Sequence, residues 1–332
     1  MREWPTGRLL AVLGVLVGLV SVLSLGVGTL RIAPAELWSA FWSGEPNPYR
    51  LVLVELRVPR TLLALLVGGS LGLAGAAMQG LLRNPLAEPG VVGVSGMAAF
   101  GAVVAFYTGW AALWDFALPI GGFAGAALGV ALLQLLAGRT GSTLTLILAG
   151  IAINSLAGAL TSLALNLSPN PYAAYEILFW LMGSLADRTI EHVALAAPFM
   201  IGGWVMLISQ GRALDALSLG EDAAKSLGIE VARTTWIIVL GSALAVGAAV
   251  SIAGVIGFVG LVVPHILRPL VGHRPGKLLA VSAFGGALLT LLADILLRSL
   301  RTGVELKIGV LTALIGAPFF LMLVLRGRRT LP

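Results

Sequence analysis

The 332-residue sequence has no cysteine, only three histidines and few charged residues. Without cysteine the chain forms no disulfide, no thiolate metal site and no cysteine nucleophile. His192, His265 and His273 are too far apart in sequence for a metal-ligand spacing, so we expect no metal site. Charged residues make up 11% of the chain, whereas a soluble domain has about 25%. These scarcities exclude a soluble globular fold.

Hydrophobic residues make up 58% of the sequence and form long continuous runs. A helix needs about 20 apolar residues to cross a bilayer, whereas the strands of an outer-membrane barrel alternate in segments of about ten residues. The runs therefore predict an all-α, polytopic membrane protein with a single transmembrane domain over residues 1–332. We expect about ten transmembrane helices, at residues 9–30, 61–82, 91–110, 116–138, 143–165, 193–210, 234–252, 256–270, 278–297 and 308–325.

The distribution of Lys and Arg between the loops predicts the orientation. Ten crossings leave both termini on one side, and the loops of that side hold most of the Lys and Arg residues. Such residues are enriched in cytoplasmic loops, so we expect a bacterial inner-membrane protein with both termini in the cytoplasm. The net charge of +6 is then explained by the Lys and Arg residues of the cytoplasmic loops. We therefore expect no nucleic-acid partner. The first apolar run is longer than a signal-peptide core and is expected to be retained.

A short sequence match suggests an internal repeat. When residues 58–61 are aligned with residues 231–234, Gly68 falls on Gly241 in the helices that follow. These are the second and seventh crossings, which run in opposite directions. Inverted repeats are typical of transporters, although chance similarity between two helices rich in Gly, Ala and Leu remains the alternative.

Charged residues are also missing from the middle of every expected crossing. The nearest candidate is Asp294, which lies toward a helix end with Arg298 one turn later. Ion-coupled carriers place ionisable groups at such positions. The energy for transport must then come from elsewhere, or the chain is a passive pore. An ion-gradient-driven secondary transporter of a small solute remains the alternative reading.

Residues 212–230 form the one polar, amphipathic segment between crossings. A helix is expected over residues 221–227, and it would carry Ala223, Ala224 and Leu227 on one side. An exposed apolar face on a cytoplasmic loop fits a protein partner. It fits a helix lying on the bilayer surface equally well.

Arginines are unusually dense on the expected outer side. Arg57 and Arg60 precede the second crossing, and Arg298 and Arg301 follow the ninth. Membrane proteins usually have their excess of Lys and Arg on the cytoplasmic side, so arginines on the outer side need an explanation. They either dock an acidic partner or reach for lipid phosphates.

Four further motifs are expected to have structural roles and no catalytic one. Residues 83–90 contain two prolines and read as a tight cytoplasmic turn, because proline does not fit inside a straight helix. Residues 166–171 read as a loop, and Gly121, Gly125 and Gly129 predict a close-packed helix face. Residues 272–277 lack the spacing and the Ser or Thr of a phosphate-binding loop, so no ATP site is expected in this chain.

A series of motifs occurs in order along the chain: Arg57-Val-Pro-Arg60-Thr, Met78-Gln79, Arg83-Asn-Pro-Leu-Ala-Glu-Pro-Gly90, Gly93-Val-Ser-Gly96, Leu148-Ala-Gly150, Phe179-Trp-Leu-Met-Gly183, Leu217-Ser-Leu-Gly-Glu221, Gly257-Phe-Val-Gly-Leu-Val-Val-Pro-His265, Ala293-Asp294-Ile and Gly316-Ala-Pro318-Phe. Through these motifs the sequence resembles the FecCD-type permeases of type II ABC importers, from about Leu9 to Arg326. Gly272-His-Arg departs from the usual Asp-His-Arg of that family.

The resemblance implies the transport machinery. It implies a dimer of permease subunits, here expected to be a homodimer, with a pathway at the interface and lipid around it. Two cytoplasmic ABC ATPase subunits would bind ATP and Mg, so this chain needs no cofactor of its own and is not an enzyme. A periplasmic substrate-binding protein would deliver a metal chelate: ferric siderophore, haem or cobalamin.

The resemblance also implies site residues. The ATPase-coupling positions are Leu219, Gly220, Glu221, Ala224, Leu227 and Gly228. The binding-protein docking positions are Arg57, Arg60 and Arg298. Ser142 and Thr143 fall at the cytoplasmic gate, where Leu144 departs from the small polar residue expected beside them.

Overall fold

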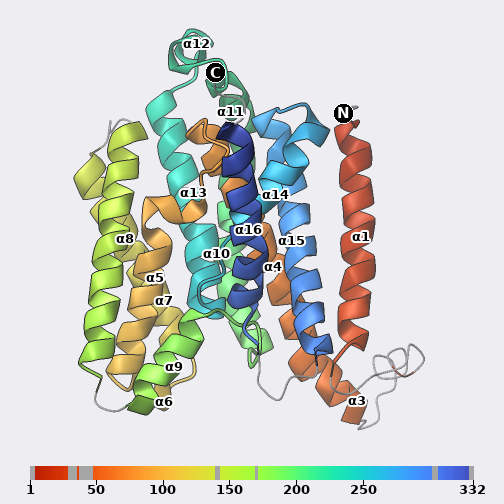
Figure 1. Ribbon diagram of the computed structural model, residues 1–332, viewed down its shortest axis with the longest axis vertical. Helices are drawn as coiled ribbons and strands as arrows, with labels where there is room; N and C mark the ends of the chain where they lie inside the picture. Colours follow the sequence, from red (N-terminus) through yellow and green to blue (C-terminus); the bar gives the residue numbers. More distant parts are fainter. Residues whose placement is uncertain are drawn as a thin grey trace.

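The computed structural model describes residues 4–28, 36, 48–138, 143–168, 171–300 and 306–328. In these residues the chain folds into a bundle of helices without strands (Figure 1). Seven helical segments are long and apolar enough to cross a membrane. They are α1 (Thr6–Gly26), Tyr49–Leu81 with α4 (Val58–Leu81), α7 (Ala117–Ala137), α8 (Thr143–Asn166), α10 (Ile190–Ser209), α13 (Val231–Ala253) and α15 (Pro275–Ser299).

Three shorter apolar helices complete the set of ten predicted crossings: α5 (Val94–Tyr107), α14 (Val259–Leu267) with the 3-10 turn η3 (Arg268–Val271), and α16 (Ile308–Arg328). The prediction of an all-α polytopic membrane protein is therefore confirmed. Short elements connect or extend the crossings: α3 (Pro48–Leu51), the π-helix η1 (Val52–Arg57), the 3-10 turn η2 (Pro89–Val92), α6 (Trp110–Leu113), α9 (Pro171–Leu181), α11 (Gly211–Leu217) and α12 (Glu221–Ser226).

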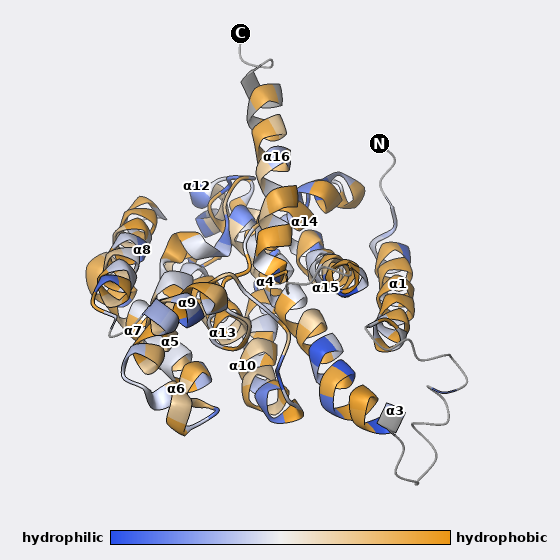
Figure 2. Ribbon diagram, turned by 60° about the horizontal axis from the view of Figure 1, so that its bottom comes forward, coloured by the Kyte–Doolittle hydropathy of each residue, from blue (hydrophilic) through white to orange (hydrophobic). Residues whose placement is uncertain are grey.

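The bundle has two distinct ends (Figure 1). The start of α1, the end of α16, α11 and α12 lie together at one end, which we call the α12 end. The element α3 and the end of α15 lie at the other, which we call the α3 end. Hydrophilic residues concentrate toward these ends (Figure 2), and the flanks carry exposed apolar side chains such as Val15, Leu19 and Val22 of α1. This distribution suits a protein surrounded by lipid.

Helix α4 is buried along most of its length, and it packs most extensively on α15. The contact is a backbone contact, because a Cβ added to Gly68 or Gly286 would overlap the carbonyl oxygen of the other residue. Gly72 lies equally close to the Ser282 carbonyl of α15, and Gly75 to the Gly260 carbonyl of α14. Small residues permit this approach where lipid supplies no hydrophobic driving force.

The two helices that the sequence match aligns, α4 and α13, run in opposite directions (Figure 1). They begin at the aligned residues Val58 and Val231. Helix α4 of the first half packs on α15 of the second, and α13 of the second half packs on α7 of the first. Each of the two aligned helices thus packs on a helix of the other half of the chain, which agrees with the predicted inverted repeat.

The glycine face of α7 packs as predicted. Gly121 lies against the carbonyl of Gly101, and Gly125 lies against the carbonyl of Met97, both in α5. The α5–α7 pair is therefore a second site of close backbone packing.

The two connectors that the sequence predicts are found, the second only in part. Helix α8 ends at Asn166 and α9 begins at Pro171, so the break between them falls where the sequence reads as a loop. Residues 83–86 form the exposed turn that the sequence predicts, but the chain then buries Ala87 and Pro89 and enters η2 before α5 begins. Both segments contain prolines, which stop one helix but also suit the first turn of the next.

Replacement of Gly68 by Ala is expected to destabilise the bundle by about 1–3 kcal/mol, as overpacking of a tight interface does. The matched control is Gly158→Ala in α8, where an added Cβ meets no atom within 4 Å. Thermal unfolding in detergent micelles measures both. Equal midpoints for the two variants would contradict the backbone contact between α4 and α15.

Candidate functional site

The predicted coupling segment forms a two-helix projection at the α12 end (Figure 1). Its first helix, α11, is anchored in the bundle by Leu214 and Leu217, which are buried. Asp215 accepts a hydrogen bond of 2.8 Å from the backbone N–H of Gly276, in the first turn of α15. This hydrogen bond ties the projection to the start of α15.

Helix α12 is bounded by Gly220, with φ of 109°, and by Gly228, with φ of 81°. These backbone conformations favour glycine, which explains both residues at the predicted positions. Glu221 lies in the first turn of α12, where a carboxylate is favoured by the helix dipole.

The exposed apolar side chains of the projection are Leu219 and Leu227, which are 70% and 63% exposed. Ala224 is fully buried, and its carbonyl accepts a hydrogen bond from the N–H of Ile229 at 3.0 Å. The prediction that Ala224 shares an exposed face with Leu227 is thus wrong, because the chain folds back over that side of this short helix.

At the α3 end, the three predicted docking arginines lie in one cluster. Arg60 contacts Oδ1 of Asp294 through Nε and Nη2, each at 2.8 Å. Arg298 contacts Oδ2 of the same carboxylate at 2.9 Å. Asp294 is only 1% exposed, so one buried carboxylate joins the start of α4 to the end of α15.

The cluster also holds α1. Arg57 is 5% exposed and donates to the Leu25 carbonyl at 2.6 Å. Arg298 donates to the carbonyls of Ser24 and Val27, both at 2.9 Å. The three arginines that are predicted to dock a partner therefore also bind groups of this chain, in α1 and α15.

A cavity of about 220 Å³ opens within this cluster, and Arg188 completes its lining together with Arg57, Arg60, Arg298 and Asp187. Arg188 donates to the Ile252 carbonyl at 2.7 Å. The sequence analysis missed Arg188, which lies alone in a loop far from the other arginines. Arg301 lies outside the described residues.

Of the two predicted gate residues, Thr143 begins α8 and is half-buried. Ser142 lies outside the described residues. The contacts described for the chain do not bring Thr143 together with the coupling segment.

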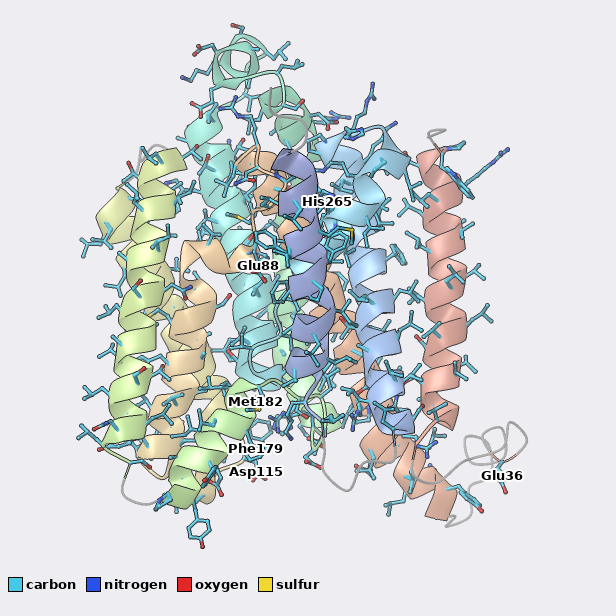
Figure 3. All side chains as sticks on the ribbon, in the orientation of Figure 1. Glu36, Glu88, Asp115, Phe179, Met182 and His265 are labelled. Atoms are coloured by element: carbon cyan, nitrogen blue, oxygen red, sulfur yellow. The ribbon has the colours of Figure 1, made fainter. Side chains whose placement is uncertain are left out.

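A polar cavity on the flank of the bundle was not foreseen. Glu88 lies below the α12 end (Figure 3) and is half-buried. It belongs to the connector before α5, so it is not a charge at the middle of an expected crossing. Its carboxylate accepts a hydrogen bond of 3.0 Å from the N–H of Phe258. The cavity of about 400 Å³ is lined by Glu88, Gly90, Val91, Ile151, Asn154 and Ser155. The re-entrant path of residues 83–90, which composition alone does not reveal, brings Glu88 there.

Phe258 connects this cavity to α16. It has a left-handed backbone, with φ of 67°, and its ring lies against Gly316 of α16. His265 contacts Phe319 of the same helix, with ring centroids 5.7 Å apart. The break between α13 and α14 thus supports α16 on one side and binds Glu88 on the other.

Replacement of Asp294 by Ala is expected to cost about 3–5 kcal/mol of stability, because it leaves Arg60 and Arg298 without their shared buried counter-ion. The control is Asp222→Ala, since the fully exposed Asp222 is 3.8 Å from Lys225 and surface pairs contribute little. Thermal unfolding of both variants compares them. A midpoint for Asp294→Ala as high as that of the control would show that the cluster does not hold α4 to α15.

Comparison with known proteins agrees with this architecture. The model of the FecCD transport family matches residues 15–326. The chain is 40% identical over 309 residues to the Fe(3+) dicitrate transport system permease protein FecD of Escherichia coli (strain K12), covering 93% of this chain and 95% of that protein. It is 41% identical over 312 residues to the vitamin B12 import system permease protein BtuC of Vibrio cholerae serotype O1, covering 93% and 91%.

A solved structure, described as an inward-facing conformation of a metal-chelate type ABC transporter, superposes with a TM-score of 0.86. It is 34% identical in sequence, and the match covers 96% of this chain and 99% of that one. With the projection at one end of the bundle and the arginine cluster at the other, these matches show that the chain belongs to the FecCD transport family.

Proposed function

We propose that this chain is the permease subunit of a binding-protein-dependent ABC importer that moves a metal chelate into the cytoplasm. Family membership over almost the whole chain carries the proposal. The relatives named for their cargo transport ferric dicitrate, vitamin B12 and, in Yersinia pestis, hemin. We expect a ferric siderophore, haem or cobalamin, in that order.

The α12 end faces the cytoplasm in this proposal, and both termini lie there. The ATPase subunits bind ATP and Mg, and they meet the projection at Leu219, Gly220, Glu221 and Leu227. The two exposed leucines supply apolar contact area, which is favourable to bury against a protein partner. Ala224 and Gly228 shape the projection rather than touch the partner. The anchor of α11 on α15 then passes movement into the bundle.

The α3 end faces the periplasm and receives the substrate-binding protein. The cavity lined by Arg57, Arg60, Arg188 and Arg298 is strongly basic, which suits an acidic side chain of that partner. Two copies of the permease form a homodimer and enclose the pathway between them. Thr143 and Ser142 belong to its cytoplasmic gate.

Glu88 on the polar cavity favours the alternative of an ion-gradient-driven carrier, because carriers place carboxylates inside the bundle. The buried carboxylate of Asp294 is already paired with Arg60 and Arg298. The hydrogen bond that Glu88 accepts from the N–H of Phe258 gives it a structural role that needs no ion. The energy source distinguishes the two functions. Uptake that stops when the ion gradient is collapsed, while ATP remains, would establish the carrier.

Replacement of Leu227 by Asp is expected to lower chelate-stimulated ATP hydrolysis and uptake at least about tenfold, since a loss of 1.4 kcal/mol at an interface already reduces affinity tenfold. The matched control is Leu227→Met, which keeps the side chain apolar. The assay uses proteoliposomes that contain the permease, its ATPase and its binding protein, with labelled ferric siderophore, haem and cobalamin. Wild-type uptake by the Asp variant would refute this coupling surface.

Replacement of Arg60 by Gln is expected to weaken association with the binding protein about tenfold and to reduce the dependence of that association on salt. Arg60 is chosen because it is 21% exposed and Gln can still donate to Asp294. Arg50→Gln, at an exposed position in α3 outside the cavity, removes the same charge as a control. Equal losses in the two variants, measured at several salt concentrations, would indicate a general charge effect instead of a docking site.

A further inference from the structure

A second basic cavity lies at the α12 end, where α4 ends and α15 begins. It has a volume of about 190 Å³, and its polar lining consists of Gln79, Arg83, Ser218, Arg268 and His273. We call it the basic pocket. Of the coupling segment only Ser218 lines the pocket, and none of the residues that we propose to meet the ATPase does.

The side chains that line the basic pocket carry no negative charge. Arg83 and Arg268 are cationic, and the imidazole of His273 can donate a hydrogen bond to an anion. The neighbouring carboxylate of Asp215 is already bonded to the N–H of Gly276. The pocket is therefore electropositive, which favours an anionic ligand.

Arg268 is held in place within the pocket. Its Nη2 donates to Oε1 of Gln79 at 2.6 Å, and the amide nitrogen of Gln79 donates in turn to the Leu261 carbonyl at 3.3 Å. The Nε of Arg268 is buried and has no protein acceptor. A buried donor of this kind is costly, and a guanidinium fixed by one edge is prepared for an oxygen anion.

The other two basic residues extend into the pocket from strained backbone. Arg83 and His273 have φ of 48° and 60°, in the left-handed region that non-glycine residues seldom occupy. Both side chains are exposed. Strain of this kind persists where the surroundings require it, and here it places two basic side chains beside Arg268.

We propose that the basic pocket binds a phosphate group, either that of an anionic phospholipid headgroup or a free phosphate ion. The pocket lies at the ends of two crossings, which is the depth of the lipid headgroups, and basic pockets between transmembrane helices on the cytoplasmic side bind such headgroups. Ser218 ends α11 and leads into α12, so a bound phosphate sits against the base of the projection. From the proposed function, this proposal takes only the orientation that places the α12 end at the cytoplasmic side of the membrane. It does not depend on which cargo is transported.

The experiment measures thermal unfolding of the full chain in uncharged detergent. Phosphatidylglycerol, cardiolipin, phosphatidylcholine and inorganic phosphate are added separately at constant ionic strength. Anionic lipid or phosphate is expected to raise the unfolding temperature by about 4 °C or more near saturation, and phosphatidylcholine is not. A shift with anionic lipid alone identifies a headgroup site, and a shift with inorganic phosphate identifies a free-ion site.

The variants Arg83→Gln and His273→Gln are expected to lose at least half of the shift, while Arg274→Gln keeps it. Arg274 is also exposed and basic, immediately beside His273, but it does not line the pocket. Because Arg83 and His273 are exposed, their variants are expected to fold, and the unfolding curve without ligand verifies this.

Three results would overturn the proposal. The first is no shift with any of the anionic additions. The second is an equal shift in Arg83→Gln, His273→Gln and Arg274→Gln, which would indicate diffuse attraction to the surface. The third is an unchanged shift in the pocket variants together with loss of ATPase association, which would assign the basic pocket to a protein interface. None of these results depends on whether the chain imports a chelate.

Discussion

The close backbone contact between α4 and its neighbours is the constraint on which the rest of the structure depends. Glycines at 68, 72 and 75 let α4 approach α15 and α14 to the distance of backbone atoms. In a bilayer such packing replaces the hydrophobic effect that would drive association in water. It also fixes the relative position of the two halves of the chain, since α4 belongs to the first and α14 and α15 to the second.

Both ends of α4 carry polar groups that belong to the proposed sites. At the α3 end, Arg60 meets the buried carboxylate of Asp294. At the α12 end, Gln79 orients Arg268 in the basic pocket. In the proposed orientation, α4 thus extends from the periplasmic arginine cluster to the cytoplasmic end, packed on α15 along the way.

The segments that interrupt the helices serve a different purpose. The re-entrant path before α5 and the break before α14 meet at the hydrogen bond between Glu88 and Phe258, and α16 rests on the same break through Gly316. Irregular backbone is tolerated at membrane depth where it is buried in protein or borders a polar cavity. The re-entrant path borders the polar cavity on the flank of the bundle, whereas α1 exposes apolar side chains such as Val15 and Leu19.

Much of this arrangement could be predicted from the sequence. Hydrophobic run length predicted ten crossings, because each needs enough apolar residues to span the bilayer, and the described residues contain seven helices of that kind and three shorter apolar ones. Local glycine, charge and polarity located the projection at Gly220 and Gly228 and singled out Arg57, Arg60 and Arg298. Tertiary structure alone decided that Asp294 joins two of these arginines, that Ala224 is buried and that Glu88 enters the bundle beside Phe258. Those outcomes depend on contacts between residues far apart in the chain, and no local pattern encodes such distances.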